Sequence, residues 1–210
     1  MASSKTIHIQ FISDFICPWC YIGKIRLERL KEKLIGEINL DIELVPFVLY
    51  PQIPSGGLPK SAFSKRTKPG MGKSLKQEAQ KEGVEINYKN IERIPYSLEA
   101  HRLIQLVEDN ATKFELAKQI FISYFEKGQD IEDLDYLVSL GKSIGMSKSI
   151  LSEFLFTNLG EKELNTALKR VKEEFVTVVP SLKLDRKIIL PGLQPFDVWE
   201  NYIRRAAEIQ

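Results

Sequence analysis

The sequence predicts an α/β protein in which one β-sheet is interrupted by a large all-helical insertion. Three observations support this. Strand-like segments lie near both ends of the 210-residue chain, and the segment between them repeats apolar residues at helical spacing. The two cysteines, Cys17 and Cys20, directly follow the first of these strands. The prediction is therefore a sheet assembled from an N-terminal βαβ unit and a C-terminal ββα unit.

The N-terminal segment has the pattern of a βαβ unit. A strand is predicted over residues 6–12, TIHIQFI, where Ile7, Ile9 and Phe11 share one face. A helix follows from Pro18, with apolar residues at helical spacing and Gly36 as the expected stop. Residues 38–49, INLDIELVPFVL, supply a second apolar strand. A strand, a helix and a strand within ~45 residues are expected to place the two strands parallel.

The middle of the chain is predicted to be helical. Residues 50–74 are rich in Pro, Gly, Ser and Lys, which indicates a loop. Beyond it we expect about four or five helices without a strand between them, one of them starting with Asp130 as its N-cap and Asp133 near it. Their apolar stripes are expected to form the core of a helical lobe: Ala100, Leu103, Ile104, Val107, Phe114, Ala117, Ile120, Phe121, Tyr124, Leu164, Leu168, Val171 and Phe175.

The C-terminal segment returns to strands. TVVPSLKLDRKIILPG is predicted to form two short strands about a turn at Asp185 and Arg186, followed by a helix over residues 195–209. A ββα unit alone has too little surface to bury against, so we expect its strands to join the N-terminal sheet. Trp199, on this last helix, is predicted to be a core residue.

The amino-acid composition argues against several classes of function. The chain has 43% hydrophobic residues, enough for a core without disulfide bridges. Its 30 basic and 28 acidic residues give a net charge of +2, which argues against nucleic-acid or membrane-surface binding. The N-terminus lacks the ~7–15 apolar residues of a secretory signal, and no run approaches the ~18 of a membrane span. We therefore expect a cytoplasmic protein, and leave its oligomeric state open.

The CPWC segment is the strongest functional signal. Cys17 is expected at the N-cap of the helix, where free N–H groups and the helix dipole stabilise a thiolate. Cysteines at such positions reach pKa values of ~3.5–7, against ~8.5 for a free thiol. Pro18 fits the first helical turn, and Cys20 falls on the same helix face within disulfide reach. We expect Cys17 to attack and Cys20 to resolve, while the effect of Asp14 stays open.

Two other roles of the cysteine pair were weighed. A zinc site would need further ligands, and the chain's only histidines, His8 and His101, lack the spacing of a zinc finger. A structural bridge would restrain the unfolded chain little, because it would close a very short loop. A redox-active pair without a metal or organic cofactor is therefore the favoured hypothesis.

The sequence also resembles a known family. SDFICPWCYIGK resembles the active-site segment of the DsbA-like thioredoxin-fold family, specifically its FrnE-type cytosolic branch, and the likeness continues through PFVLYP, EAHRL, YFEKGQDI and VVPSLKLDRKIILPGLQPFDV. The resemblance implies a thioredoxin-like core of residues 1–50 and 176–210. Residues 51–175 would form a loop plus a helical insertion lobe.

The resemblance also implies roles for site residues. Cys17 would be the nucleophile and Cys20 the resolving thiol of a protein dithiol–disulfide oxidoreductase, with Pro18 and Trp19 between them. Pro180 would be a cis-proline facing the disulfide, and Val179 would offer its backbone to an extended substrate. The sequence departs from the family pattern at four positions that bear on substrate preference: Val48, Val178, Arg186 and Pro191.

Other functions remain as alternatives. The main one is a glutathione-dependent transferase or isomerase of the kappa or 2-hydroxychromene-2-carboxylate isomerase class, whose members commonly have serine in place of Cys17. In either case the partners would be protein or small-molecule thiols and disulfides, with glutathione as an optional co-substrate. A third alternative is a non-catalytic redox sensor or holdase.

Residues 60–81 contain two further candidate functional features, a motif that resembles a phosphate-binding loop and a cluster of basic side chains. TKPGMGKS, residues 67–74, imitates a phosphate-binding loop, but Thr67 occupies its first glycine position and no strand precedes it. The basic side chains around it predict a solvated loop or, alternatively, a lid that attracts anionic substrate: Lys60, Lys65, Arg66, Lys68, Lys73, Lys76 and Lys81.

Overall fold

A four-stranded sheet forms the centre of the protein. The computed structural model describes residues 5–62, 71–185 and 188–209. The strands lie in the order β2-β1-β5-β6 and comprise β1 (Lys5–Ser13), β2 (Ile38–Pro46), β5 (Ser181–Leu184) and β6 (Ile188–Pro191). β1 pairs with β2 in parallel and with β5 in antiparallel, and β5 pairs with β6 in antiparallel. The predicted single sheet, with parallel strands in its βαβ unit, is confirmed.

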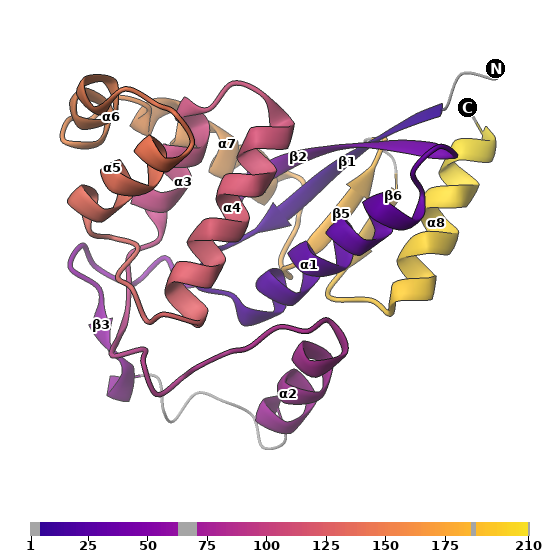
Figure 1. The fold of residues 1–210 in the computed structure, drawn as a ribbon, viewed down its shortest axis with the longest axis horizontal. Coiled ribbons are helices and arrows are strands. Elements are labelled where there is room, and N and C mark those ends of the chain that lie inside the picture. The colour runs from indigo at the N-terminus through magenta and orange to yellow at the C-terminus, as the bar shows by residue number, and fades with distance from the viewer. Residues whose placement is uncertain (1–4, 63–70, 186–187, 210) are drawn as a thin grey trace.

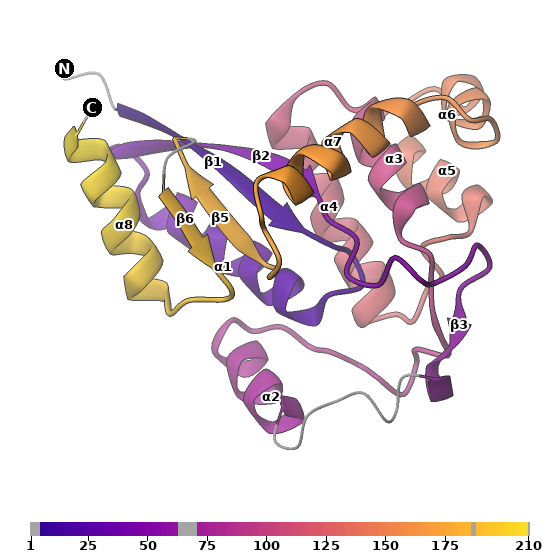
Figure 2. The same ribbon diagram turned by 180° about the vertical axis from the view of Figure 1, so that it is seen from behind.

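Two helices cover one face of this sheet. α1 (Pro18–Lys33) and α8 (Phe196–Ile209) lie together in front of the strands in Figure 1, and Figure 2 shows the strands from behind. The core between helices and sheet is apolar: Ile7, Ile9, Phe11, Leu27, Leu30, Leu34, Ile38, Leu40, Ile42, Leu182, Leu184, Leu190, Trp199 and Ile203 are all buried. The predicted core position of Trp199 is confirmed.

The insertion lies between β2 and β5 in the chain. It contains α2 (Met71–Lys81), α3 (Leu98–Leu106), α4 (Asn110–Phe125), α5 (Leu134–Ser143), α6 (Lys148–Leu155) and α7 (Glu161–Glu173). α3 to α7 gather at one end of the sheet, whereas α2 lies apart from them beside α1 (Figure 1). The lobe's apolar cluster includes Phe15, Cys17, Cys20 and Tyr21, so the start of α1 packs into the insertion.

The predicted loop over residues 50–74 was partly wrong. The segment contains β3 (Leu58–Pro59) and a 3₁₀ helix (Lys60–Ala62), and its last residues begin α2. β3 pairs with β4 (Arg93–Ile94), a strand that was not expected within the insertion. Strands of two residues are too short to show an alternating pattern. α2 buries only Leu75 and Ala79 among its described side chains, too few for a clear apolar stripe.

Two side-chain predictions in the lobe were also wrong. Asp133, not Asp130, caps α5 by accepting the Tyr136 N–H at 3.1 Å, whereas Asp130 accepts the Glu132 N–H in the preceding turn. Phe175 does not join the α7 stripe. It follows the end of that helix, its φ of 56° turns the chain away, and its side chain is 87% exposed. Periodicity could not show that α7 stops at Glu173.

Among the described residues, none of the helices has the length and apolar character needed to cross a membrane.

Candidate active site

Cys17 occupies the N-cap of α1, as predicted. Its backbone is extended (φ −93°, ψ 110°), and its Sγ accepts the Cys20 N–H at 3.4 Å. The Cys17 thiol also donates to the Val179 carbonyl at 3.8 Å. Both cysteines are free thiols, and Cys17 is 2% exposed while Cys20 is fully buried. The Cys17 sulfur therefore lies at the N-terminus of α1, and Cys20 lies buried in the first turn of the same helix.

The other predicted site residues directly follow Cys17 in the chain or directly precede β5. Pro18 is the first residue of α1, and Trp19 is half-buried against the lobe. The Val179–Pro180 peptide bond is cis, and it brings the Val179 carbonyl to Cys17. The sequence reasoning did not single out Gly23. A Cβ on Gly23 would lie 3.3 Å from both Pro180 Cγ and the Trp199 ring, so a side chain there would crowd α1 against Pro180.

Asp14 is buried directly before the dithiol. Its carbonyl accepts the Cys17 N–H at 3.1 Å, and its carboxylate accepts the N–H groups of Leu49 at 2.6 Å and Ile16 at 3.3 Å. These contacts answer the question that the sequence left open, because the carboxylate is held by backbone donors. His101 Nε2 lies 3.7 Å from Asp14 Oδ1, so helix α3 of the insertion reaches the base of the site.

The environment of Cys20 disfavours its thiolate form. Burial is the main cause that raises the pKa of the Cys20 thiol, and the hydrogen bond and charge of Cys17 raise it further. The negative charge of Asp14 acts in the same direction, whereas a hydrogen bond from the Asp14 backbone lowers the pKa. Cys20 therefore rests as a protonated thiol and needs a proton acceptor before it can attack.

Buried charges join α1 to α4 of the insertion. Lys24 is fully buried and donates to Glu28, and its ammonium lies 4.1 Å from the centre of the Phe114 ring. Lys118 of α4 contacts the other oxygen of Glu28 at 3.1 Å. Burial lowers the pKa of Lys24 to about 8, although Glu28 opposes this shift.

A second buried ion cluster joins α1 to α2. Arg26 is 2% exposed and donates to Glu82 at 2.7 Å and to Glu78 at 2.8 Å. It also donates to the Gln194 carbonyl, just before α8. Arg29 contacts Glu82 at 2.5 Å. The active-site helix is thus fixed to the insertion by directional contacts that its apolar stripe did not reveal.

The remaining candidates lie elsewhere or outside the described chain. His8 is on an exposed part of β1 and pairs with Asp41 at 2.7 Å. In the part of the chain that the structure describes, no three His, Cys, Asp or Glu side chains gather as metal ligands. Lys73, Lys76 and Lys81 belong to α2 and Lys60 to the 3₁₀ helix. Lys65, Arg66, Lys68 and Arg186, and the first half of the TKPGMGKS motif, lie outside the described residues.

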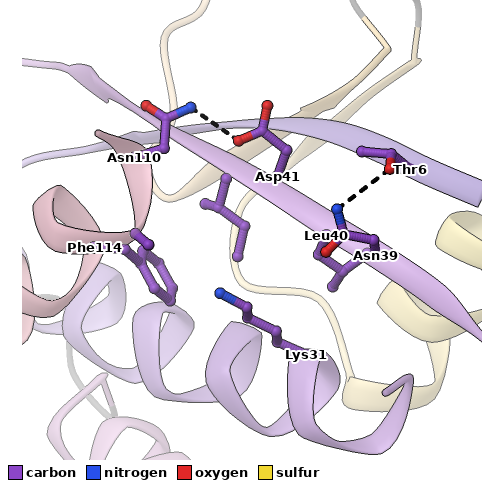
Figure 3. A pocket seen from close by; sticks show the side chains of 9 residues that line it. Thr6, Lys31, Asn39, Leu40, Asp41, Asn110 and Phe114 are labelled. Carbon is purple, nitrogen blue, oxygen red and sulfur yellow. Dashed lines mark hydrogen bonds between the residues drawn. The ribbon is translucent and has the colours of Figure 1, made fainter. Parts of the chain in front are cut away.

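A polar cavity of about 360 Å³ lies away from the cysteines, between α1, β2 and the start of α4. Figure 3 shows Lys31, Asn39, Asp41 and Asn110 around it, with Asn110 bonded to Asp41 at 2.9 Å. The other oxygen of Asp41 accepts from His8. The oxygens of this carboxylate are therefore already engaged by the protein.

The geometry defines a thioredoxin-like protein with a dithiol at a helix N-terminus, and comparisons with known proteins agree. Residues 8–204 match the DSBA-like thioredoxin domain family. The Bacillus subtilis protein YwbO, described as uncharacterized, is 30% identical over 204 residues, which cover 94% of this chain and 96% of YwbO. The chain belongs to the DSBA-like thioredoxin domain family.

Solved structures show the same fold at low sequence identity. A "probable DsbA oxidoreductase" of Streptomyces coelicolor has a TM-score of 0.83 at 20% identity, over 97% of this chain and 91% of that one. A 2-hydroxychromene-2-carboxylate isomerase has a TM-score of 0.74 at 18% identity, over 97% and 99%. The cytosolic disulfide reductase DsbM of Pseudomonas aeruginosa has a TM-score of 0.67 at 16% identity, over 97% and 100%. The predicted fold class and family are confirmed.

Proposed function

We propose that this protein is a thiol–disulfide oxidoreductase that exchanges disulfides through Cys17 and Cys20. One observation carries the proposal: the Cys17 sulfur caps α1, accepts the Cys20 N–H and lies against Val179, next to cis-Pro180. Helix N-termini favour a thiolate, and a second thiol within one turn can complete the exchange. Pro18 and Trp19 would support the site, and the Val179 backbone would face the substrate.

The exchange proceeds in two balanced steps. The Cys17 thiolate attacks a substrate disulfide, which forms a mixed disulfide and releases one substrate thiolate. Cys20 then loses its proton and attacks the Cys17 sulfur, which breaks the bond to the substrate and releases the second thiolate. The substrate gains two electrons, and the protein retains a Cys17–Cys20 disulfide. The same steps run in reverse when the oxidised pair transfers its disulfide.

We also propose a cytoplasmic location and the FrnE-type branch as the nearest group, following the sequence-based expectation. The fold likeness to a cytosolic reductase supports the first of these. In a reducing compartment a pair of this kind would be kept as a dithiol, unless its potential lies well below the glutathione poise.

The test is a pair of cysteine variants. Cys17→Ala should abolish reduction of a disulfide-bonded protein by thiol reductant, with a loss of at least about 100-fold. Cys20→Ser should accumulate a mixed disulfide between Cys17 and the substrate, visible as a mass increase that dithiothreitol removes. Unchanged turnover in Cys17→Ala would refute the proposal.

The alternative is a glutathione-dependent isomerase or transferase. Its support is the shared fold with 2-hydroxychromene-2-carboxylate isomerase and with a DsbM structure that contains glutathione. Such an enzyme would not need the second thiol. Isomerase activity that survives in Cys20→Ser, with glutathione bound at equilibrium, would favour this alternative.

A further inference from the structure

His101 is a buried histidine with an unsatisfied ring nitrogen. The residue is 5% exposed, and its Nε2 has no hydrogen-bond partner among the described residues. Leaving a buried polar atom unpaired costs about 1–3 kcal/mol, so such an atom calls for an explanation. The ring packs against Phe15, with centroids 4.7 Å apart, and this contact aims it at the base of the dithiol site.

Asp14 connects this histidine to the cysteines. Its Oδ1 lies 3.7 Å from His101 Nε2, a distance at which a protonated imidazole and a carboxylate attract each other strongly when buried. The backbone carbonyl of Asp14 accepts the Cys17 N–H, and the negative charge of Asp14 contributes to the raised pKa of the Cys20 thiol. Asp14 therefore contacts the dithiol segment through its backbone and His101 through its carboxylate.

A small cavity of about 50 Å³ lies beside His101. This volume has room for a water molecule, whose share of the liquid is ~30 Å³. The cavity is lined by Ser13, Phe15, Leu44, Val45, Pro46, His101, Ile104, Gln105 and Lys113. Gln105 and Lys113 are only half-buried, so the cavity extends from the buried ring toward the surface between α3, α4 and the end of β2.

Resting on the proposed function, we propose that the Asp14–His101 pair takes up the proton that Cys20 loses when it resolves the mixed disulfide, and that the cavity beside His101 exchanges this proton with solvent. His101 would act on Cys20 through Asp14, so it is a positioning residue for this step. The insertion would thereby supply His101 of α3 to the chemistry of the thioredoxin-like site.

The Cys20 S–H bond breaks, its proton passes by way of the Asp14 carboxylate to His101 Nε2, and its electron pair forms the bond to the Cys17 sulfur. The bond between Cys17 and the substrate breaks, and its electrons leave on the substrate thiolate. An imidazolium then faces the Asp14 carboxylate until the proton reaches water. The other titratable groups near the pair are Lys113, which lines the cavity, and Tyr124, whose pKa is raised by burial and in part by Asp14.

The competing explanation is that Asp14 acts through its charge alone. This explanation predicts the opposite change in the rate of resolution when Asp14 is replaced. The charge of Asp14 helps to raise the pKa of Cys20. Removing that charge would make Cys20 more acidic, and so would accelerate resolution at neutral pH. Removing a proton acceptor would slow it.

The experiment is stopped-flow reaction of the reduced protein with an aromatic disulfide whose two halves leave as coloured thiolates. The first release reports the attack of Cys17, and the second reports resolution by Cys20. In His101→Gln and Asp14→Asn the second release should slow by at least about tenfold, within the range of general acid–base effects, while the first is unchanged. Because resolution removes a proton from Cys20, the second rate of the unchanged protein should depend on pH, and His101→Gln should change this dependence.

The chain offers a matched control. His8 and Asp41 form the exposed histidine–carboxylate pair on β1 and β2, and Figure 3 shows Asp41 at the polar cavity. His8→Gln and Asp41→Asn should leave both releases unchanged. If Asp14→Asn fails to fold, His101→Gln carries the test alone, because it keeps every backbone contact of Asp14.

The outcomes separate this inference from the proposed function. An unchanged second release in His101→Gln, or a faster one in Asp14→Asn, would overturn the relay while Cys17→Ala still abolishes the first release. Two undiminished releases from Cys17→Ala would overturn the proposed function itself.

Discussion

α1 contacts the sheet through an apolar face and contacts the insertion through buried charges on its two flanks. Toward the sheet it packs Leu27, Leu30 and Leu34 against strands and α8, with hydrocarbon on both sides. Toward the insertion it places Lys24 and Arg26, both buried and both paired with carboxylates. Hydrocarbon contacts stabilise without much direction, whereas hydrogen-bonded ion pairs require each group at a set place. The sheet therefore holds the helix, and the insertion fixes where its dithiol end lies.

The sheet face should carry the larger share of stability. Trp199 of α8 is fully buried in this core, so Trp199→Ala should lower the free energy of unfolding by about 3–5 kcal/mol. Trp199→Phe should cost less, because the indole nitrogen has no hydrogen-bond partner among the described residues. Urea unfolding measures both. Tyr202→Ala, at a position 38% exposed on the same helix, is the control, and an equal loss there would contradict this ranking.

The ion cluster of Arg26 and Glu82 should lose stabilising energy when a single charge is removed. Arg26→Met leaves Glu82, whose side chain is 2% exposed, with Arg29 as its remaining partner. We expect a loss of about 3 kcal/mol in urea unfolding, because a buried carboxylate is left partly uncompensated. The double variant Arg26→Met with Glu82→Leu should recover most of this loss.

The matched control for Arg26 is an exposed pair. Lys169 and Glu173 lie 3.7 Å apart, with side chains 77% and 64% exposed. Lys169→Met should change the free energy of unfolding by less than about 0.5 kcal/mol. If the double variant at Arg26 and Glu82 is no more stable than Arg26→Met alone, the cluster does not act as a charge pair.

This contrast also explains what could be predicted from the sequence. The alternating residues of β1 and the apolar stripes of α3 and α4 correctly predicted the sheet and the lobe, because burial of hydrocarbon leaves a periodic trace. The CPWC segment correctly predicted an N-cap cysteine, since proline and the following helix pattern are local signals. The family resemblance placed Pro180 beside it, which local pattern alone could not do.

The features that the sequence did not predict have two causes. The sequence did not predict the burial of Lys24 and Arg26, because lysine and arginine are rarely buried and only their partners in the fold explain it. The contact of His101 with Asp14 joins residues on separate elements, and no spacing in the sequence reports it. Phe175 was assigned to the core because its spacing continues a stripe beyond the end of the helix. Non-local partners and helix ends therefore escaped the periodic pattern.

The pH dependence of stability gives the smallest effect, and it tests the burial of Lys24 directly. Burial lowers the pKa of Lys24 to about 8 in the folded protein, against 10.5 for the group in water. Between these values the unfolded chain binds more protons than the folded one, so raising the pH favours the folded state. The contribution of Lys24 therefore improves from pH 8 upward and is complete above its unfolded pKa.

Lys24→Met isolates this contribution. Methionine keeps an apolar side chain against Phe114 but carries no charge. The other titratable groups are the same in both proteins, so their contributions cancel in the difference between the two unfolding free energies. Relative to Lys24→Met, the unchanged protein should gain about 1–2 kcal/mol between pH ~8 and ~10. If the unfolding free energies of the two proteins changed with pH in parallel, Lys24 would be solvated. The buried charge of Arg26 would then be the contact of this kind that joins α1 to the insertion.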